Sequence, residues 1–164
     1  MNNVGRLGSR CLFVGVLALG FGNLACAADF TLNFPAGAAC AFELRIDGDG
    51  GNQVYREFLD KNGNLVRSLS AGTGSALTFT NVGTGAALST QSNGAVTSIT
   101  YNADGSYTFV TTGHNVLILF PTDVPAGPTT TLYVGRVVFT ADSAFNFTLL
   151  DHHGTATDIC AALS

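Results

Sequence analysis

The run Val116-Leu117-Ile118-Leu119-Phe120 opens the most apolar part of the chain, and Thr129-Thr130-Thr131-Leu132-Tyr133-Val134-Gly135-Arg136-Val137-Val138-Phe139-Thr140 completes it. A loop with three prolines, Pro121–Pro128, separates the two runs. Both runs are rich in β-branched and aromatic residues, which favour an extended backbone. Adjacent apolar runs of this kind are typical of the most buried strands of a sheet. We therefore expect two central strands here.

Shorter runs separated by turn residues extend this pattern toward both ends of the chain. Residues 40–47 alternate cleanly, because Cys40, Phe42, Leu44 and Ile46 share one face and polar residues share the other. No segment repeats its apolar residues at the helical period. The further expected strands are 29–34, 40–47, 54–59, 64–69, 77–79, 86–90, 98–101, 106–110, 145–149 and 156–160. The sequence thus predicts an all-β protein, an antiparallel β-sandwich or flattened barrel of about ten short strands.

Two hairpins show how the strands are expected to pair. Asp60-Lys61-Asn62-Gly63 predicts a type I turn with a left-handed Gly63, which places Phe58 opposite Val66 and Glu57 opposite Arg67. A similar hairpin spans residues 98–110, and each hairpin is followed by a Thr-Gly pair and another apolar run. We interpret these as two degenerate copies of a three-strand unit.

The first residues have the pattern of a secretory signal peptide. Arg6 and Arg10 precede an apolar core at 11–21, and Ala25-Cys26-Ala27 supplies small residues before a cleavage site. We therefore expect residues 1–27 to be removed, residues 28–164 to form a single domain, and the product to be secreted and extracellular. Lipid anchoring at Cys26 is a minor alternative, because Asn23 occupies the position where that signal favours Leu.

Cleavage at this site removes two cysteines and two of the seven basic residues. The remaining five basic and eleven acidic residues give no basic face, which argues against nucleic acid and against anionic membrane surfaces as partners. No later stretch is long enough to span a membrane. The two remaining cysteines, Cys40 and Cys160, predict one disulfide that brings the first and last strands together. Closing so long a loop stabilises the fold by roughly 4–5 kcal/mol in the chain-entropy description.

Few residues in this chain could carry out catalysis. It has three histidines and one lysine, and it lacks the His-Glu-x-x-His, Cys-x-x-Cys and nucleophile-elbow patterns. His114 and Asp123 flank the first central strand, and Tyr133 and Arg136 lie on the second. These four are the candidate ligand-binding residues. The absence of tryptophan argues against a broad aromatic platform for carbohydrate.

Two short clusters are weak candidates for metal ligands, and neither predicts a bound cofactor. Asp47 and Asp49 have the spacing that begins a calcium loop, but the later ligands of an EF-hand are missing. Asp151, His152 and His153 could hold zinc only if the chain turned at Gly154, because adjacent residues of a strand face opposite ways. Ordinary turn residues are the preferred interpretation of both clusters.

Residues 112–123 and 156–160 resemble a group of small exported microbial all-β proteins of uncharacterised function. The resemblance implies secretion and implies no activity. We expect a secreted, non-enzymatic binding or surface-interaction module for an extracellular ligand, with contacts from the loop 121–128. One alternative is an extracellular hydrolase or metal-dependent enzyme that uses His114 with Asp123, or His152 and His153. Another is a structural or protective secreted protein.

Overall fold

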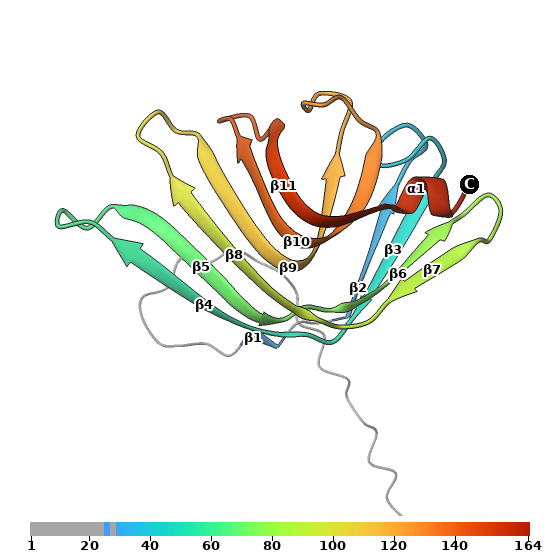
Figure 1. The fold of residues 1–164 in the computed structure, drawn as a ribbon, viewed down its shortest axis with the longest axis horizontal. Helices are drawn as coiled ribbons and strands as arrows, with labels where there is room; N and C mark the ends of the chain where they lie inside the picture. Colours follow the sequence, from blue (N-terminus) through green and yellow to red (C-terminus); the bar gives the residue numbers. More distant parts are fainter. Residues whose placement is uncertain (1–24, 27–28) are drawn as a thin grey trace, which may run out of the picture.

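The computed structural model describes residues 25–26 and 29–164, and nearly all of this part is β-structure (Figure 1). The strands are β1 (Ala25–Cys26), β2 (Phe30–Phe34), β3 (Leu44–Asp49), β4 (Asn52–Leu59), β5 (Leu65–Thr73), β6 (Ala76–Asn81), β7 (Ala87–Thr90), β8 (Gly94–Tyr101), β9 (Tyr107–Leu119), β10 (Thr129–Ala141) and β11 (Phe147–Asp158). A four-residue helix, α1 (Ile159–Ala162), follows β11. No helix of the described part has the length and apolarity needed to cross a membrane. The expected signal peptide lies outside the described residues except for β1.

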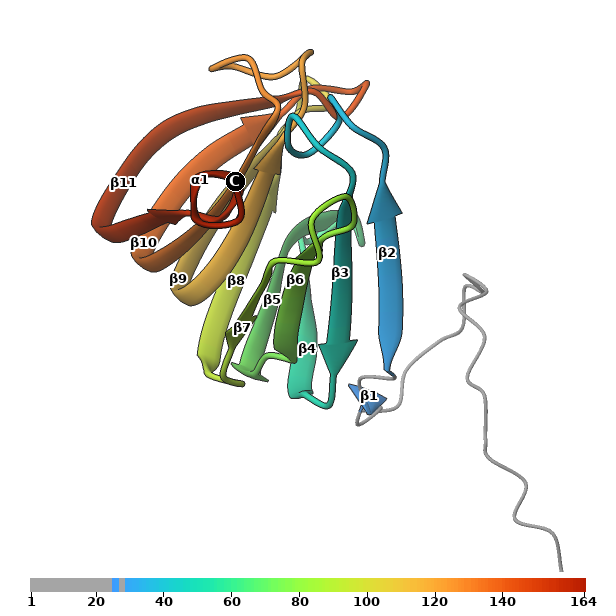
Figure 2. The same ribbon diagram turned by 90° about the vertical axis from the view of Figure 1, so that its right-hand side faces the viewer.

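The strands form two antiparallel sheets, which confirms the predicted β-sandwich architecture. One sheet has the order β1-β4-β5-β8-β9-β10-β11, and the other has the order β2-β3-β6-β7. Only two or three residues separate β3 from β4, β5 from β6 and β7 from β8, so these pairs cross from one sheet to the other. In Figure 2 the four-stranded sheet lies on one side and β9–β11 lie on the other. Three short connections therefore join the two sheets of the sandwich.

A row of glycines crosses the larger sheet. Gly72, Ala95, Gly113, Gly135 and Gly154 stand in direct register on β5, β8, β9, β10 and β11. The four glycines have φ angles between +92° and +147°, and a Cβ atom on any of them would lie 2.1–2.2 Å from a backbone oxygen of the adjacent strand. Only glycine permits this conformation and this close approach. We call this row the glycine crease.

The strands that cross the glycine crease fold back on themselves. β9 and β10 have 13 residues each and would span roughly 40 Å if straight. Nevertheless, Val124 in the loop at one end of this hairpin exchanges backbone hydrogen bonds with Phe147 and Leu149, near the other end. Asp123, only 4% exposed, accepts hydrogen bonds from the backbone nitrogens of Phe120 and Phe147 at 2.6 and 2.7 Å. The loop 121–128 is thus fastened to β11.

Two apolar cores result from this folding. The first lies between the four-stranded sheet, α1 and one face of β9 and β10; its buried members are Ala39, Cys40, Leu44, Ile46, Phe79, Ile159 and Leu163. The second lies on the opposite face of β9 and β10, inside the bend; its buried members are Leu117, Leu119, Tyr133, Val137 and Phe139. Both faces of the two central strands are therefore covered, as their continuous apolar sequence predicts.

The disulfide between Cys40 and Cys160 is confirmed, with a Cα–Cα distance of 5.5 Å. The expectation that it joins the first and last strands was wrong. It links the loop before β3 to α1, while β2 and β11 are edge strands of different sheets. The expected final strand at 156–160 was right only for residues 156–158, which are the end of β11. The chain then turns into α1, because the Asp158 side chain accepts a hydrogen bond from Ala161 N at 2.9 Å and caps the helix.

The first hairpin has the predicted turn but a different register. Gly63 is left-handed, and its nitrogen donates to the Asp60 carbonyl at 3.1 Å. However, Phe58 stands opposite Arg67, because a bulge shifts the pairing by one residue between Phe58 and Leu59. The Arg67 guanidinium lies 4.2 Å from the Phe58 ring centroid, a cation–π contact that favours this pairing.

The second hairpin has the same turn, but the proposed three-strand repeat is not maintained. The backbone nitrogen of Asn102 donates to the Ser106 carbonyl oxygen, and in the first hairpin the backbone nitrogen of Asp60 donates to the Asn64 carbonyl oxygen. After the first hairpin the chain enters the other sheet as β6. After the second it continues through Gly113 as the same strand, β9, because the glycine bends the strand instead of ending it.

Candidate ligand-binding site

Two neighbouring cavities lie beside the glycine crease. The smaller, of about 210 Å³, is lined by Thr97, Thr111, Asn115, Val116, Leu117, Tyr133, Val137 and Phe139. We call it the crease cavity. The larger, of about 280 Å³, shares Thr97, Asn115 and Val116 with it and is otherwise lined by a mixture of polar and apolar residues and by His114. The two cavities are therefore neighbours along β8 and β9.

The crease cavity follows from the register of three strands. Thr97, Thr111 and Val137 stand opposite one another on β8, β9 and β10, and four residues further along β9 Asn115 stands opposite Tyr133. Between these two rows lies the Gly113–Gly135 pair, which has no side chains. Residues two positions apart on a strand share a face, so the rows on either side of the pair form the walls. The glycines that bend the sheet also leave this space.

Two buried polar atoms at this site lack a hydrogen-bond partner in the described part of the chain. They are Thr111 Oγ1 and Asn115 Nδ2, and both residues line the crease cavity. Thr111 is 6% exposed. Leaving such a group unpaired costs roughly 1–3 kcal/mol, so native proteins rarely retain one without a reason. Each of these atoms can donate to an acceptor oxygen in the cavity, since a hydroxyl and an amide NH₂ both donate.

The remaining walls are apolar or uncharged. Leu117, Val137 and Phe139 are all buried, and Tyr133 is 7% exposed. Burial raises the pKa of Tyr133 above its ordinary value, so this phenol is neutral at physiological pH. Among residues 25–26 and 29–164, no charged side chain lines the crease cavity. The site is therefore suited to an uncharged molecule, because an ion buried here would have no opposite charge.

The structure separates the four ligand-binding residues that the sequence suggests. Tyr133 lines the crease cavity and His114 lines the cavity next to it. Asp123 instead fastens the loop to β11 through both carboxylate oxygens. Five residues of β9, roughly 16 Å of strand, lie between His114 and the end of that strand. His114 and Asp123 are thus not brought together as an acid–base pair.

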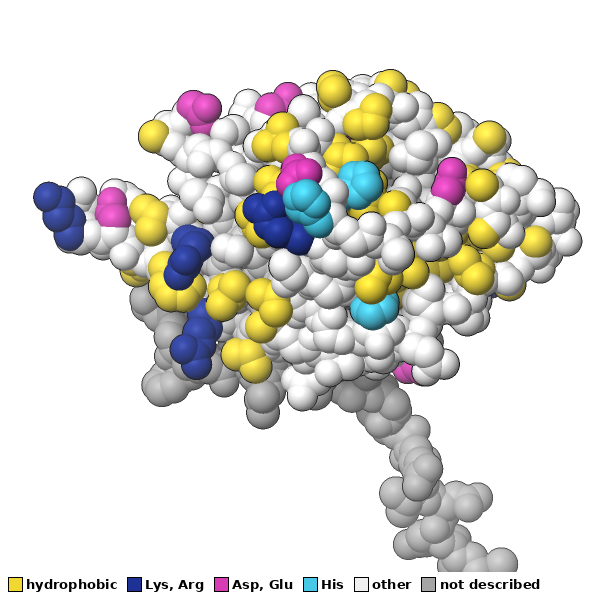
Figure 3. Space-filling model, viewed as in Figure 1, with side chains coloured by type: hydrophobic (Ala, Val, Ile, Leu, Met, Phe, Trp, Pro, Cys, Tyr) yellow, Lys and Arg dark blue, Asp and Glu magenta, His cyan; other side chains and the backbone are white. Residues whose placement is uncertain are grey.

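Arg136 belongs to an ion-pair cluster on the opposite face of β10 from Tyr133. Its guanidinium lies 3.3 Å from Asp151, and His153 Nε2 lies 3.2 Å from the same carboxylate oxygen. A group of basic, acidic and histidine side chains is visible near the middle of Figure 3. His152 stands opposite Val137 and its ring lies 5.3 Å from that of Tyr133, so the adjacent histidines do face opposite ways.

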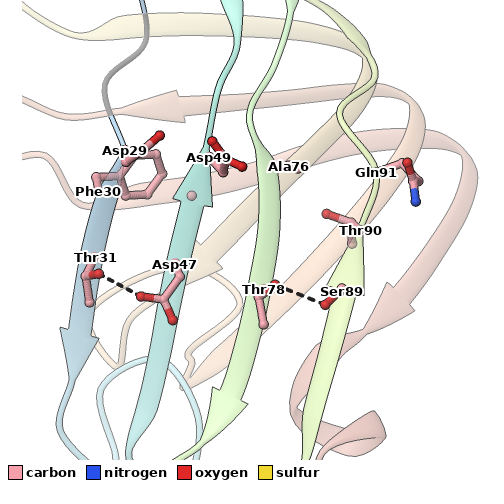
Figure 4. Close-up of a pocket in the computed structure, with 11 residues that line it drawn as sticks. Asp29, Phe30, Thr31, Asp47, Asp49, Ala76, Thr78, Ser89, Thr90 and Gln91 are labelled. Carbon is pink, nitrogen blue, oxygen red and sulfur yellow. Dashed lines mark hydrogen bonds between the residues drawn. The ribbon is translucent and has the colours of Figure 1, made fainter.

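Metal ligation by the weak candidates stays a prediction. Across residues 25–26 and 29–164, no three His, Cys, Asp or Glu side chains are grouped so as to hold a metal ion. Asp47 and Asp49 lie on the outer face of the four-stranded sheet, where an open groove of about 590 Å³ crosses β2, β3, β6 and β7 (Figure 4).

Asp47 is already engaged within that groove. It accepts a hydrogen bond from Thr31 Oγ1 at 2.6 Å and from two nitrogens of Arg45 at 2.9 and 3.0 Å. The Thr31 hydroxyl and then the Arg45 guanidinium hold the pKa of Asp47 below its usual value. Thr78 and Ser89 are also paired with each other at 3.0 Å. Several polar side chains of the groove are thus already paired with one another, and it is the weaker candidate for a site.

Sequence analysis missed Thr97, Thr111 and Asn115. The available signal was the even spacing of Thr111 and Asn115 on either side of Gly113, in a short polar stretch between the apolar runs 107–110 and 116–120. From the sequence alone, residues 111–115 connect the expected strands 106–110 and 116–120, which hides the fact that Thr111 and Asn115 lie on one continuous strand.

The comparisons with known proteins add no family to these observations. No protein-family model, no curated protein and no solved structure matches this chain. The expected similarity to small exported microbial proteins therefore stays a prediction.

Proposed function

We propose that this chain is a non-enzymatic binding protein that holds one small, uncharged molecule with an acceptor oxygen in the crease cavity. The observation that carries the proposal is the pair of buried, unpartnered donors, Thr111 Oγ1 and Asn115 Nδ2, in an otherwise apolar enclosure. A concave apolar site with a few convergent polar groups is the usual form of a small-molecule site.

The size and chemistry of the cavity limit the ligand. An engineered protein cavity of about 150 Å³ admits benzene, so a volume of about 210 Å³ is suited to one ring with a short substituent. Phe139 and Tyr133 supply aromatic walls for such a ring. A carbonyl oxygen can accept a hydrogen bond from Thr111 or from Asn115. An aromatic ketone is the simplest molecule with these properties.

Binding is preferred to hydrolysis because the groups near the cavity do not form a catalytic set. A general base must lie within hydrogen-bond reach of the proton that it takes. His114 is exposed and Asp123 is committed to two backbone nitrogens, so neither supports the other.

The test compares two probes of nearly equal shape, acetophenone and isopropylbenzene, of which only the first carries an oxygen. Titrations of the isotopically labelled protein should show saturable shifts at Leu117, Val137 and Phe139. We expect acetophenone to bind about five- to tenfold more tightly, the equivalent of roughly one net hydrogen bond. The Thr111→Val variant keeps the side-chain shape and should remove most of that difference.

Thr112→Val is the matched control, because Thr112 is exposed and does not line the cavity. It should leave both affinities unchanged. The proposal would be overturned by equal affinity for the two probes, by an equal effect of the two variants, or by shifts located away from the cavity. A crystal soaked in acetophenone that held only water at Thr111 and Asn115 would overturn it as well.

A further inference from the structure

The edges of the two sheets differ in how well they are protected against pairing with another chain. In the smaller sheet β7 has four residues, and β2 has five and is followed by Pro35. β11 is longer, but it is interrupted by a bulge between Leu149 and Asp151 and carries several charged or ionisable side chains. Short strands, bulges and charge are the usual devices that keep a sheet edge from pairing.

β4 has fewer of these protections: from Asn52 to Phe58 it has no bulge, and its only charged side chains are those of Arg56 and Glu57. Its residues from Asn52 to Phe58 pair with β5 without interruption, and the strand contains no proline or lysine. Large apolar side chains are exposed along it: Val54 is 49% exposed, Tyr55 is 51% exposed and Leu59 is 60% exposed. A long, regular and partly apolar edge is suited to strand addition, in which an extended segment joins the sheet through backbone hydrogen bonds.

The chain itself shows that this edge accepts a strand. β1 pairs antiparallel with β4, with Ala25 opposite Gln53 and Cys26 opposite Asn52. Both residues of β1 belong to the segment that we expect signal peptidase to remove. In the processed protein the whole outer side of β4, from Asn52 to Leu59, would then be free.

We infer that the processed protein forms a dimer in which β4 of one copy pairs antiparallel with β4 of a second copy. The two copies are related by a two-fold axis perpendicular to the sheet. Directly opposite residues share a face of the sheet, whereas adjacent residues of one strand do not, so the residue nearest the axis must stand opposite its own copy. The candidate central residues are therefore Val54, Tyr55, Arg56 and Glu57. The inference depends on the expected cleavage and is independent of the crease cavity.

Charge and overlap select Tyr55 as the centre. A centre at Arg56 or at Glu57 places two like charges directly opposite each other, which is destabilising. A centre at Val54 pairs only residues 52–56, whereas a centre at Tyr55 pairs residues 52–58. With Tyr55 opposite its own copy, the carboxylate of Glu57 faces the amide of Gln53, and Val54 faces Arg56.

Cysteine cross-linking tests this register directly. Residues directly opposite in a sheet have Cα atoms about 4.5–5.5 Å apart, within the range for a disulfide, whereas an offset of two residues exceeds that range. We expect Tyr55→Cys in the processed, secreted protein to give a cross-linked dimer on mild oxidation. Val54→Cys and Arg56→Cys alone should cross-link several-fold less, but their mixture should cross-link efficiently.

Sedimentation of the unmodified processed protein supplies a measurement that needs no substitution. A dimer that dissociates on dilution is the expected result. The inference is overturned by a monomer at every concentration up to about 1 mM, the weak end of specific association. It is also overturned if Val54→Cys alone cross-links as readily as Tyr55→Cys, or if the mixture of Val54→Cys and Arg56→Cys does not cross-link.

Discussion

The hairpin tips at Asp60–Asn64 and Asp142–Asn146 have the same hydrogen bonds but different residues at the critical position. In each, one oxygen of the aspartate accepts from the backbone nitrogens two and four residues later, at 2.8–2.9 Å. The other oxygen accepts from the asparagine side chain, at 2.9–3.0 Å. The fourth residue is left-handed in both tips, but it is Gly63 in one and Phe145 in the other, with φ angles of +86° and +62°.

This difference shows that the tip does not require glycine, whereas the glycine crease does. A Cβ atom added at Gly63 would meet nothing within 4 Å, but one added at Gly135 would lie 2.1 Å from the His153 carbonyl oxygen. A left-handed phenylalanine is a genuine backbone outlier. Phe145 is 61% exposed and its ring stacks on Tyr107, with centroids 5.3 Å apart. At the tip, glycine only makes the left-handed conformation less costly. At the crease, glycine is also needed because the adjacent strand leaves no space for a Cβ atom.

The largest difference in stability should be between the variants Gly135→Ala and Gly63→Ala. Gly63→Ala should lower the free energy of unfolding by about 1 kcal/mol, the usual cost of a left-handed alanine. Gly135→Ala adds a collision with backbone, and we expect a loss of about 3 kcal/mol or more. Urea unfolding of the two variants measures both losses. Similar losses would show that the crease bends the sheet without requiring the close approach.

Exchanging the residues at the two tips should give a smaller effect. Gly63→Phe places a left-handed aromatic residue at a tip with open space around it, so we expect a loss of about 1–2 kcal/mol. Phe145→Gly relieves the same backbone cost but loses an aromatic pair worth about 0.5–1.5 kcal/mol, so its net effect should be close to zero. Thermal unfolding compares the two. A neutral Gly63→Phe variant would mean that the stack on Tyr107 is not what stabilises Phe145.

The sequence predicted local features of the fold better than those that depend on register. The apolar runs, the turn at Asp60–Gly63 and the single cysteine pair each involve short-range patterns or a single possible partner, and the structure confirms them. The glycine crease could not be predicted in this way. In the sequence Gly72, Gly113 and Gly154 have the signature of a turn and Gly135 lies inside an expected strand, and their alignment becomes evident only when strand register is known.

The candidate site has the same dependence on register. Tyr133 was predicted as a ligand-binding residue because it lies on a central strand, and it does line the crease cavity. Thr111 and Asn115 were not predicted, because polar residues around a glycine indicate a loop when they are considered alone. Their shared cavity exists only because Gly113 meets Gly135 across two strands.

The tips should also respond to acid, and this is the smallest effect that we expect. The Asn64 side chain, followed by backbone nitrogens, holds the pKa of Asp60 below its ordinary value, and Asn146 acts in the same way on Asp142. A carboxyl group whose pKa is lowered by folding stabilises the protein above its unfolded pKa, near 3.9. That stabilisation is lost as the pH falls through the lower, folded value.

The Asn64→Ala variant tests whether each network acts locally. Removal of the amide donor should move the pKa of Asp60 back toward its ordinary value, while Asp142 in the same molecule serves as the internal control. Carboxyl carbon shifts recorded by NMR between pH 2 and 6 measure both titrations in one sample. An equal rise in the pKa of Asp142 would show that the two tips are coupled through the sheet. The two turns would then not be stabilised independently by their own hydrogen bonds.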